Sequence, residues 1–296
     1  LVGDFDTQAM LKKVEHYYGG IEHQATPAPL RAVEPPQQGE RRVLLQRPGS
    51  ASYLVTGFHV PAADHEDNYP LLMLDAILTG ADAISFQGGA WMGRSSRLYR
   101  ALVDRGLAAE VGSNLELAPD PSLYTFWATA REGVAPEKIE RGLFRELEKI
   151  AAKPPTQREL KKALQQTRAQ FAYSADGVTG QAFVLGYFAA TSSLEILGGL
   201  LDRLAAVTPE QVQTAAQIYL RDNNRTVGWF IPTTVQSGGA ASRPQAVKRC
   251  FFSSAKPATP SATGIDLPIQ RFPLSCGGTL LVCANANTPT VSLRGS

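Results

Sequence analysis

The stretch "GRSSRLYRALVDRGLAAEVGS", residues 93–113, joins a helix signal to a strand signal and decides the fold. Ser95 or Ser96 is placed to cap a short helix, because a serine hydroxyl accepts a hydrogen bond from a free N–H group of the first turn. Gly106 is expected to end that helix, since glycine readily adopts the left-handed conformation found at helix ends. The following residues alternate between two sides, which predicts a half-buried strand. Its inward side would hold Ala109, Val111, Ser113, Leu115 and Leu117.

The segments before this stretch predict two strands and a buried helix. "RRVLLQR" (41–47) and "SYLVTGFHV" (52–60) are strand runs on either side of the turn "PGSA". Residues 67–79 are apolar nearly all round, which is typical of a helix buried on every side.

The segments after it predict a hairpin, several helices and a closing strand. "APDPS" (118–122) turns the chain into the strand "LYTFWATAR", so this strand and the one before it form a hairpin. Thr156 and Glu159 make a capping box that opens one helix. The other helices are expected at 136–151, at 178–205 as a pair, and at "TPEQVQTAAQIYLRDNN", before the strand "RTVGWFIPT" ends near residue 233.

This order of elements favours the α+β class, with an antiparallel or mixed β-sheet and helices packed on one face. Residues 41–233 are predicted to form one complete domain. The Pro-rich segment 21–40 and the Ser-, Ala-, Pro- and Gly-rich segment 234–268 are interpreted as linkers. Residues 1–20, a short strand (1–5) and a helix, are interpreted as the C-terminal end of a preceding domain. Residues 269–296, with three short strands, are interpreted as the truncated start of a following one.

The composition excludes some classes of function. The net charge is +2 and no basic stripe is interleaved with aromatic residues, so nucleic-acid binding is not expected. The most apolar stretch, 183–207, is interrupted by charged residues and glycines, so no membrane span is predicted. No two of the three cysteines have the CxxC spacing, which argues against a disulfide framework or a cysteine zinc site. These cysteines are Cys250, Cys276 and Cys283. The sequence leaves open whether Cys276 and Cys283 form a disulfide bridge. It also leaves open whether the compartment is periplasmic or cytoplasmic.

The residue types that usually carry metal chemistry are present without the spacing that it needs. His16, His23, His59 and His65 belong to no HExxH or HxxEH motif. "DHED" at 64–67 gathers three carboxylates around one histidine. An acidic helix start is the favoured interpretation over a metal site, because carboxylates stabilise that end of a helix.

The remaining candidates are also better explained by structure than by catalysis. Ser85, Ser95 and Ser96 lie in no GxSxG motif, and "GGAWMGRSS" lacks the Lys-Ser/Thr of a phosphate loop. Four arginines could bind a carboxylate or a peptide terminus, but a solvated helix face is the favoured interpretation: Arg94, Arg97, Arg100 and Arg105. Four aromatic residues could line a peptide groove, but core packing is favoured: Trp91, Tyr124, Phe126 and Trp127.

"RSSRLYRALVDRGLAAEVGS" resembles a signature of the pitrilysin/insulinase family of zinc metallopeptidases, which includes the mitochondrial processing peptidase and two-domain bacterial proteases. "LLMLDAILTG" before it and "TPEQVQTAAQIYLRDNNRTVGWFIP" after it are similar to segments in the same order in that family. "LVGDFDTQAMLKKVEHYYGG" resembles the end of one peptidase-type domain, and "QRFPLSCGGTLLVCANANTPTVSLRGS" the opening strands of another.

The resemblance implies homologous α+β domains paired into halves that close over a peptide. The family's zinc motif, HxxEH with a glutamate downstream, lies in the first domain of an active half and not in this segment. The family's substrate-gripping Arg and Tyr fall on Leu102 and Ala109 here, so both are absent. We therefore expect 41–233 to be a second, non-catalytic domain with no catalytic, substrate-binding or metal residue of its own.

On this interpretation zinc belongs to the catalytic domain of the parent protein. The expected partners are other peptidase-type domains, of the same chain or of a homologous subunit, and the peptide substrate. The domain would support the catalytic domain and form part of the chamber wall. The alternatives are a structural or assembly protein of the same fold without peptidase activity, and a small-molecule enzyme that uses 80–94 as a binding loop.

Overall fold

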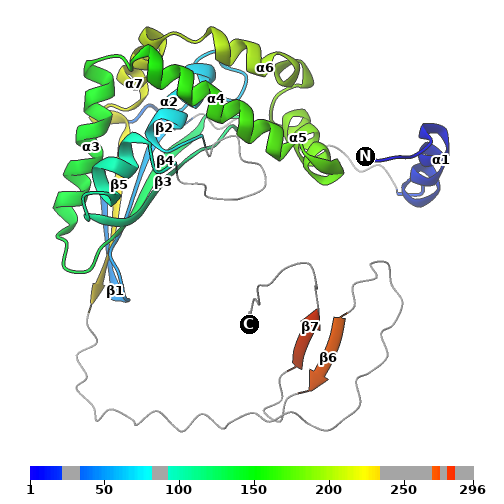
Figure 1. Ribbon diagram of the computed structural model, residues 1–296, viewed down its shortest axis with the longest axis horizontal. Coiled ribbons are helices and arrows are strands. Elements are labelled where there is room, and N and C mark those ends of the chain that lie inside the picture. The colour runs from blue at the N-terminus through cyan, green and yellow to red at the C-terminus, as the bar shows by residue number, and fades with distance from the viewer. Residues whose placement is uncertain (22–33, 82–92, 234–268, 274–278, 284–296) are drawn as a thin grey trace. The chain divides into compact units, whose positions relative to one another are not determined.

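The computed structural model describes residues 1–21, 34–81, 93–233, 269–273 and 279–283 (Figure 1). The chain divides into two units, Leu1–Val235 and Gln236–Ser296. The first contains a five-stranded sheet and the second a two-stranded one.

The five-stranded sheet is mixed, as its sequence predicts. The strand order is β1-β5-β2-β4-β3, in which β1 and β5 are parallel and every other pair is antiparallel. The strands are β1 (Arg41–Pro48), β2 (Tyr53–Val60), β3 (Ala108–Leu115), β4 (Ser122–Ala130) and β5 (Arg225–Thr233).

Helices cover one face of this sheet, which confirms the predicted α+β architecture (Figure 1). They are α2 (Asn68–Leu78), the short π-helix η2 (Tyr99–Val103), α3 (Pro136–Ala152), α4 (Gln157–Ser174), α5 (Gly177–Thr191), α6 (Leu194–Ala206) and α7 (Pro209–Tyr219), with the 3-10 turn η3 (Asp222–Asn224) before β5. A further helix, α1 (Thr7–Tyr18), precedes the sheet in the chain and is capped by Asp6, whose Oδ1 accepts from the Ala9 N–H at 2.8 Å.

The core lies between the sheet and the helices. Every residue of α2 is buried, as its unbroken apolar sequence predicts. Strand β4 alternates as a half-buried strand should, with Tyr124 and Phe126 fully buried on the helical side. The inner face of α3 carries Ile139, Leu143, Leu147 and Ile150, which are all buried.

The predicted capping box is also confirmed, and the structure contains a second one. Thr156 and Glu159 form a complete capping box at α4, and Thr208 and Gln211 form another at α7. Each box satisfies N–H groups that the first turn leaves without a partner, and so fixes where the helix begins.

The predicted turn between the first two strands does not make a hairpin. β1 and β2 follow each other in sequence, but β5 lies between them, pairing Val43 with Gly228 and Val55 with the same Gly228. The reason is that β5, about 170 residues further on, carries the buried Val227 and Trp229 that suit a central strand. Strand pairing at such a distance leaves no trace in the local sequence.

The structure corrects the opening stretch of the sequence in two details and confirms a third. Neither serine caps η2: Ser96 Oγ is buried without a hydrogen-bond partner in the described part of the chain, and Ser95 Oγ accepts from Lys162. Gly106 ends the helix as predicted, at φ +73°. The alternation then slips at Ala109, because the β3–β4 register shifts between Ala108 and Glu110. This bulge leaves Ala109 exposed and buries Ala108 instead.

Two predictions concern the ends of the chain. Residues 1–5 form no strand, because no described segment pairs with them. In the second unit, β6 (Ile269–Pro273) and β7 (Thr279–Cys283) form an antiparallel pair, while the third predicted strand and the Gly-Gly turn lie outside the described residues. No described helix is by itself long and apolar enough to cross a membrane; α5 and α6 reach the threshold only together, across a bend of 102°.

Candidate functional site

The face of the five-stranded sheet that the helices leave uncovered is the main candidate surface, and we call it the open face. It carries the outward side chains of the strands, which alternate with the buried core positions. Several are large and apolar, with exposed fractions from 41% at Leu123 to 60% at Val43. The exposed members are Val43 and Leu45 of β1, Tyr53 and Val55 of β2, and Leu123 of β4. Trp127 of β4 and Phe230 of β5 lie on the same face and are half-buried.

The strand register assembles these side chains into a band across the sheet. Val55 lies opposite Gly228 on one side and Trp127 on the other, and Trp127 lies opposite Gly112. A Cβ atom at Gly112 would meet Cζ2 of the Trp127 indole at 2.4 Å, so the indole lies directly over β3 at that glycine. The rings of Tyr53 and Phe230 lie beside each other, with centroids 5.8 Å apart and planes tilted by 53°.

The two positions that the resemblance assigns to a gripping pair are not both on a surface. Leu102 is fully buried in η2, and its Cδ2 atom is 2.7 Å from where a Cβ atom of Gly142 would lie. Ala109 is exposed in the β3 bulge. A long polar side chain at 102 would therefore have to enter the core before it reached a peptide.

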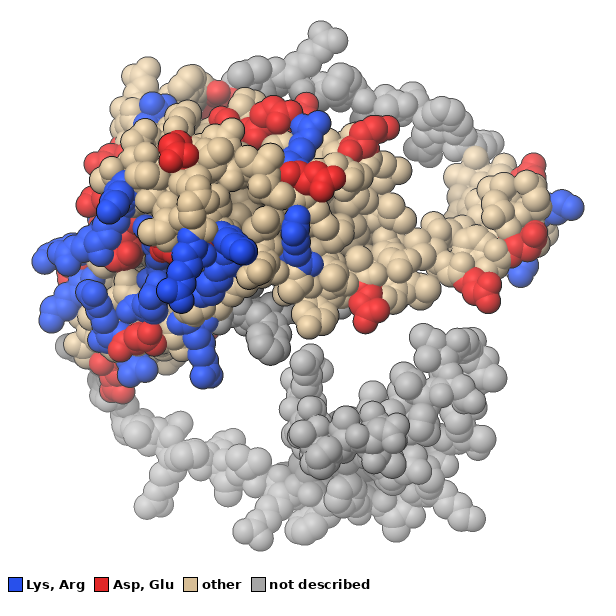
Figure 2. All heavy atoms as spheres, turned by 45° about the horizontal axis from the view of Figure 1, so that its top comes forward, with Lys and Arg blue, Asp and Glu red and all other residues tan. Residues whose placement is uncertain are grey.

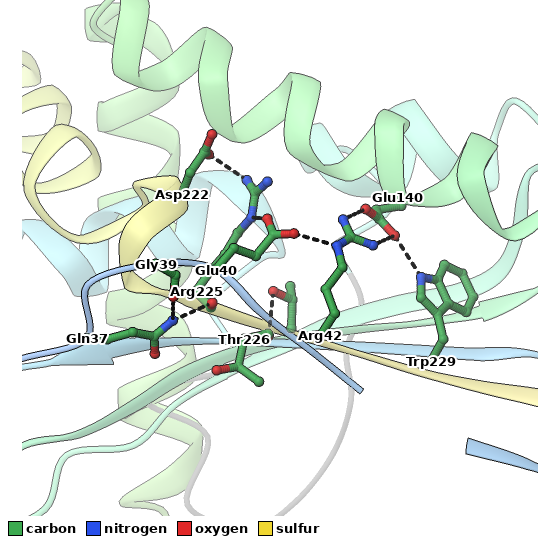
Figure 3. Close-up of polar contacts among 10 residues, drawn as sticks. Gln37, Gly39, Glu40, Arg42, Glu140, Asp222, Arg225, Thr226 and Trp229 are labelled. Carbon is green, nitrogen blue, oxygen red and sulfur yellow. Dashed lines mark hydrogen bonds and ion pairs between the residues drawn. The ribbon is translucent and has the colours of Figure 1, made fainter. Parts of the chain in front are cut away.

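A polar network fixes the edge strand β1 to α3 and β5 (Figure 3). Glu140 of α3 accepts hydrogen bonds from Arg42 of β1 and, at 2.8 Å, from the Trp229 indole N–H of β5. Burial alone would raise the pKa of Glu140, but these donors outweigh it and the pKa falls below its usual range. Arg225 and Arg42 are in turn bridged by Glu40. The network holds charge in place without presenting it to a ligand.

Arg97 and Arg100 lie at a hollow of about 350 Å³ between η2 and α4, where they meet Arg158 and Lys162. Arg105 lies at a second hollow of about 210 Å³ between η2 and α3, also lined by Lys138, Arg141 and Arg145. Figure 2 shows Lys and Arg side chains gathered at the left end of the five-stranded unit, the end at which Figure 1 places α3. Arg94 is exposed and lines neither of these two hollows.

The histidines and the acidic cluster are engaged in separate local contacts. His59 Nε2 contacts Gln37 Oε1 at 3.2 Å on the open-face side of β2. His65 accepts from the Asp67 N–H, while Asp67 itself accepts from the Tyr219 hydroxyl at 2.6 Å. Glu66 pairs with Arg203 at 2.7 Å. In the described ranges, no three His, Cys, Asp or Glu side chains gather as a metal site would require.

The aromatic candidates divide between the two faces. Tyr124 and Phe126 belong to the core, and Trp127 to the open face. Ser85, Trp91, His23 and the Cys250 and Cys276 positions lie outside the described residues.

Sequence reasoning missed two arrangements. The fully buried carboxylate of Asp75 in α2 accepts hydrogen bonds from the hydroxyls of Thr79, Ser113 and Tyr124, the last at 3.0 Å, and so ties α2 to β3 and β4. The second is that Arg158 of α4 and Arg100 of η2 line the same hollow. Arg158 and Lys162 are four residues apart on α4, a spacing that places both on one helix face and that the sequence does contain.

The family described as "Peptidase M16 inactive domain" matches residues 1–167. The chain is 24% identical over 237 residues to the zinc protease PqqE of Helicobacter pylori, a match that covers 78% of this chain and 50% of that protein. The chain thus spans about half the length of this curated relative.

Solved structures give the same fold. A protease from Helicobacter pylori matches with a TM-score of 0.70 at 23% identity, over 78% of this chain and 54% of that one. The inactive peptidase domain of a proposed zinc protease from Bordetella parapertussis matches with a TM-score of 0.54 at 27% identity, over 65% of this chain and 98% of that one.

Proposed function

Because the chain belongs to the family of M16 peptidase inactive domains, the pitrilysin/insulinase type, we propose that it acts as a non-catalytic domain of a zinc-dependent endopeptidase. In this role it supports a catalytic domain and forms part of the wall of the peptide chamber. The relative from Helicobacter pylori is named a zinc protease, which supports the class of the parent protein.

The observation that carries the proposal is the open face. A monomeric protein ordinarily buries a contiguous apolar surface, and such a surface left uncovered marks an interaction site. Here Tyr53 and Val55 of β2 and Trp127 of β4 project from two adjoining strands on a rigid sheet whose other face is fixed by helices. A flat apolar wall of this kind suits extended peptides of varied sequence, because it contributes contact area without demanding particular polar partners.

The described residues do not fit zinc. His59 and His65, both in the five-stranded unit, are engaged with Gln37 and Asp67 in separate places. We therefore infer that the zinc is held by the catalytic domain with which this domain would be paired, and that the chemical steps of peptide hydrolysis take place there.

The test compares variants of this domain within the protein that also carries the zinc-binding peptidase domain. Val55→Lys places a charge in the middle of the open face and is expected to lower kcat/KM for peptide hydrolysis at least about tenfold, because desolvating a charge next to the peptide is costly. Lys161→Gln, an exposed change on α4, is the matched control and is expected to leave kcat/KM unchanged. Zinc content should stay the same in both.

Two results would count against the chamber-wall role. One is unchanged kcat/KM in Val55→Lys with the fold intact. The other is the absence of hydrolysis of any peptide by the assembled wild-type protein at full zinc occupancy, which would favour the structural or assembly alternative.

A further inference from the structure

The hollow between η2 and α4 is strongly positive and is not explained by the proposed function, since it lies in the helical layer and not on the open face. Four cations and one carboxylate line it: Arg97, Arg100, Arg158, Lys162 and Glu159. The carboxylate is already engaged, because Glu159 accepts two hydrogen bonds from Arg97. Three cations are therefore left facing a volume of about 350 Å³.

Two of these cations have no counter-ion in the part of the chain that the structure describes. Arg100 and Arg158 form no ion pair there, and Lys162 donates only to the neutral hydroxyl of Ser95. Like charges held close together repel one another, and an arginine fork is shaped to hold a carboxylate or a phosphate. The arrangement is the one that a bound anion would stabilise.

The position of Arg158 strengthens this argument. Arg158 lies in the first turn of α4, two residues after the N-cap Thr156. The N-terminal end of a helix carries a partial positive charge, so a cation there is unfavourable and an anion is favourable. A bound anion would therefore offset the repulsion of both the helix end and the arginines.

An independent observation comes from Ser96, which lines the same hollow. Only 6% of this residue is exposed to solvent, and its Oγ atom is buried without a hydrogen-bond partner among the described residues. A buried hydroxyl left without a partner costs free energy unless a ligand satisfies it. The hydroxyl has a proton to donate, which is what an anion accepts.

From these observations we propose that the hollow between η2 and α4 binds one oxyanion, a carboxylate or a phosphate. Arg100, Arg158 and Lys162 supply the charge, and the Ser96 hydroxyl donates a hydrogen bond. Arg97 and Glu159 form the rigid back of the site. The anion has two possible sources, an acidic side chain of a protein partner or a small phosphorylated molecule, and both offer the same group of oxygens.

The experiment measures binding to the purified 296-residue chain by isothermal titration calorimetry, with inorganic phosphate in one arm and N-acetyl-aspartate in the other, at constant ionic strength. Saturable binding with one site is expected. The double variant Arg100→Gln/Arg158→Gln should weaken it at least about tenfold, because two charge-assisted contacts are lost. The matched control Lys161→Gln/Arg168→Gln removes the same charge from α4 outside the hollow, and should change the Kd less than about twofold.

Ser96→Ala separates a ligand site from mere surface charge. Removing an unpartnered buried hydroxyl should leave the Tm of the anion-free protein unchanged or raise it, while weakening anion binding several-fold. Binding in one arm alone would identify the source as phosphate or carboxylate and support the site. Absence of saturable binding in both arms would overturn the proposal. Equal weakening by the hollow and control double variants would do the same, since it would mean diffuse attraction to a basic surface.

Discussion

Arg97 and Glu159 form a two-pronged ion pair between the chain that leads into η2 and the first turn of α4, with Nε–Oε1 at 2.9 Å and Nη2–Oε2 at 3.1 Å. The same carboxylate accepts from the Thr156 N–H at 2.9 Å and so closes the capping box of α4. One side chain thus begins a helix and anchors the stretch that decides the fold. Burial alone would raise the pKa of Glu159, but the hydrogen bonds from Arg97 and Thr156 outweigh it and lower the pKa to about 2.

Replacing this carboxylate should destabilise the domain. Glu159→Gln retains an oxygen for the cap but loses the charge that Arg97 requires, so we expect the free energy of unfolding to fall by about 1–3 kcal/mol. Urea denaturation of the purified chain measures the change. Glu148→Gln, an exposed position on α3, is the matched control and should stay within about 0.5 kcal/mol of wild type.

The contribution of Glu159 should depend on pH in a defined direction. Its pKa is about 2 in the folded protein and 4.5 in its unperturbed state, so the folded form binds the proton less readily. The stabilisation is therefore complete above pH 4.5 and is lost as the pH falls toward 2. The difference in unfolding free energy between wild type and Glu159→Gln should shrink through this window; a difference that stays constant down to pH 2 would contradict the assignment.

Gly112 should be intolerant of a side chain, because the indole of Trp127 occupies the space. A Cβ atom there would meet the Trp127 ring at 2.4 and 2.6 Å. Gly112→Ala is expected to displace the indole, shift its fluorescence and cost about 1–3 kcal/mol of stability. Gly57→Ala on the same face is the control, since its Cβ would find ordinary contacts at 3.6 and 3.8 Å. Equal effects of the two changes would show that Trp127 does not lie over Gly112.

Introducing the family's gripping residues should have opposite consequences at the two positions. Leu102→Arg places a charge at a fully buried site and is expected to cost about 3 kcal/mol or more, enough to reduce soluble expression. Ala109→Tyr lies in an exposed bulge and should be tolerated, with a Tm within a few degrees of wild type. A well-folded Leu102→Arg protein would contradict the buried placement of residue 102.

The link between α3 and the two strands at the sheet edge rests on Glu140. Glu140→Ala leaves Arg42 with only Glu40 and leaves the Trp229 indole N–H without its acceptor. We expect a loss of about 2 kcal/mol in unfolding free energy and a shift in Trp229 fluorescence. Glu148→Ala on the same helix serves as the control. An unchanged emission spectrum would show that the indole N–H is not held by this carboxylate.

Local signals in the sequence predicted most of the secondary structure correctly because each depends on neighbouring residues. The capping box at Thr156 and the stop at Gly106 need only a few residues to be recognised. The serine cap failed for the opposite reason: Ser96 is buried by elements that lie far away in sequence, and its hydroxyl makes no hydrogen bond to the start of the helix.

The candidate surfaces were less predictable. Arginines on one short helix give no indication that Arg158 and Lys162 lie beside them, because that proximity depends on how α4 packs. The open face likewise follows from which side of the sheet the helices cover, and alternation along a strand does not say which side that is.

The sequence by itself determined the element types, the α+β class and the resemblance to the pitrilysin/insulinase family, because periodicity, caps and motifs are local properties. Only the tertiary structure decided that β5 lies between β1 and β2, that Leu102 is buried while Ala109 is exposed, and that three cations with a buried hydroxyl face one hollow. These facts depend on contacts between residues far apart in the chain. Their free energies come from burial and charge in the assembled core, which no short stretch of sequence contains.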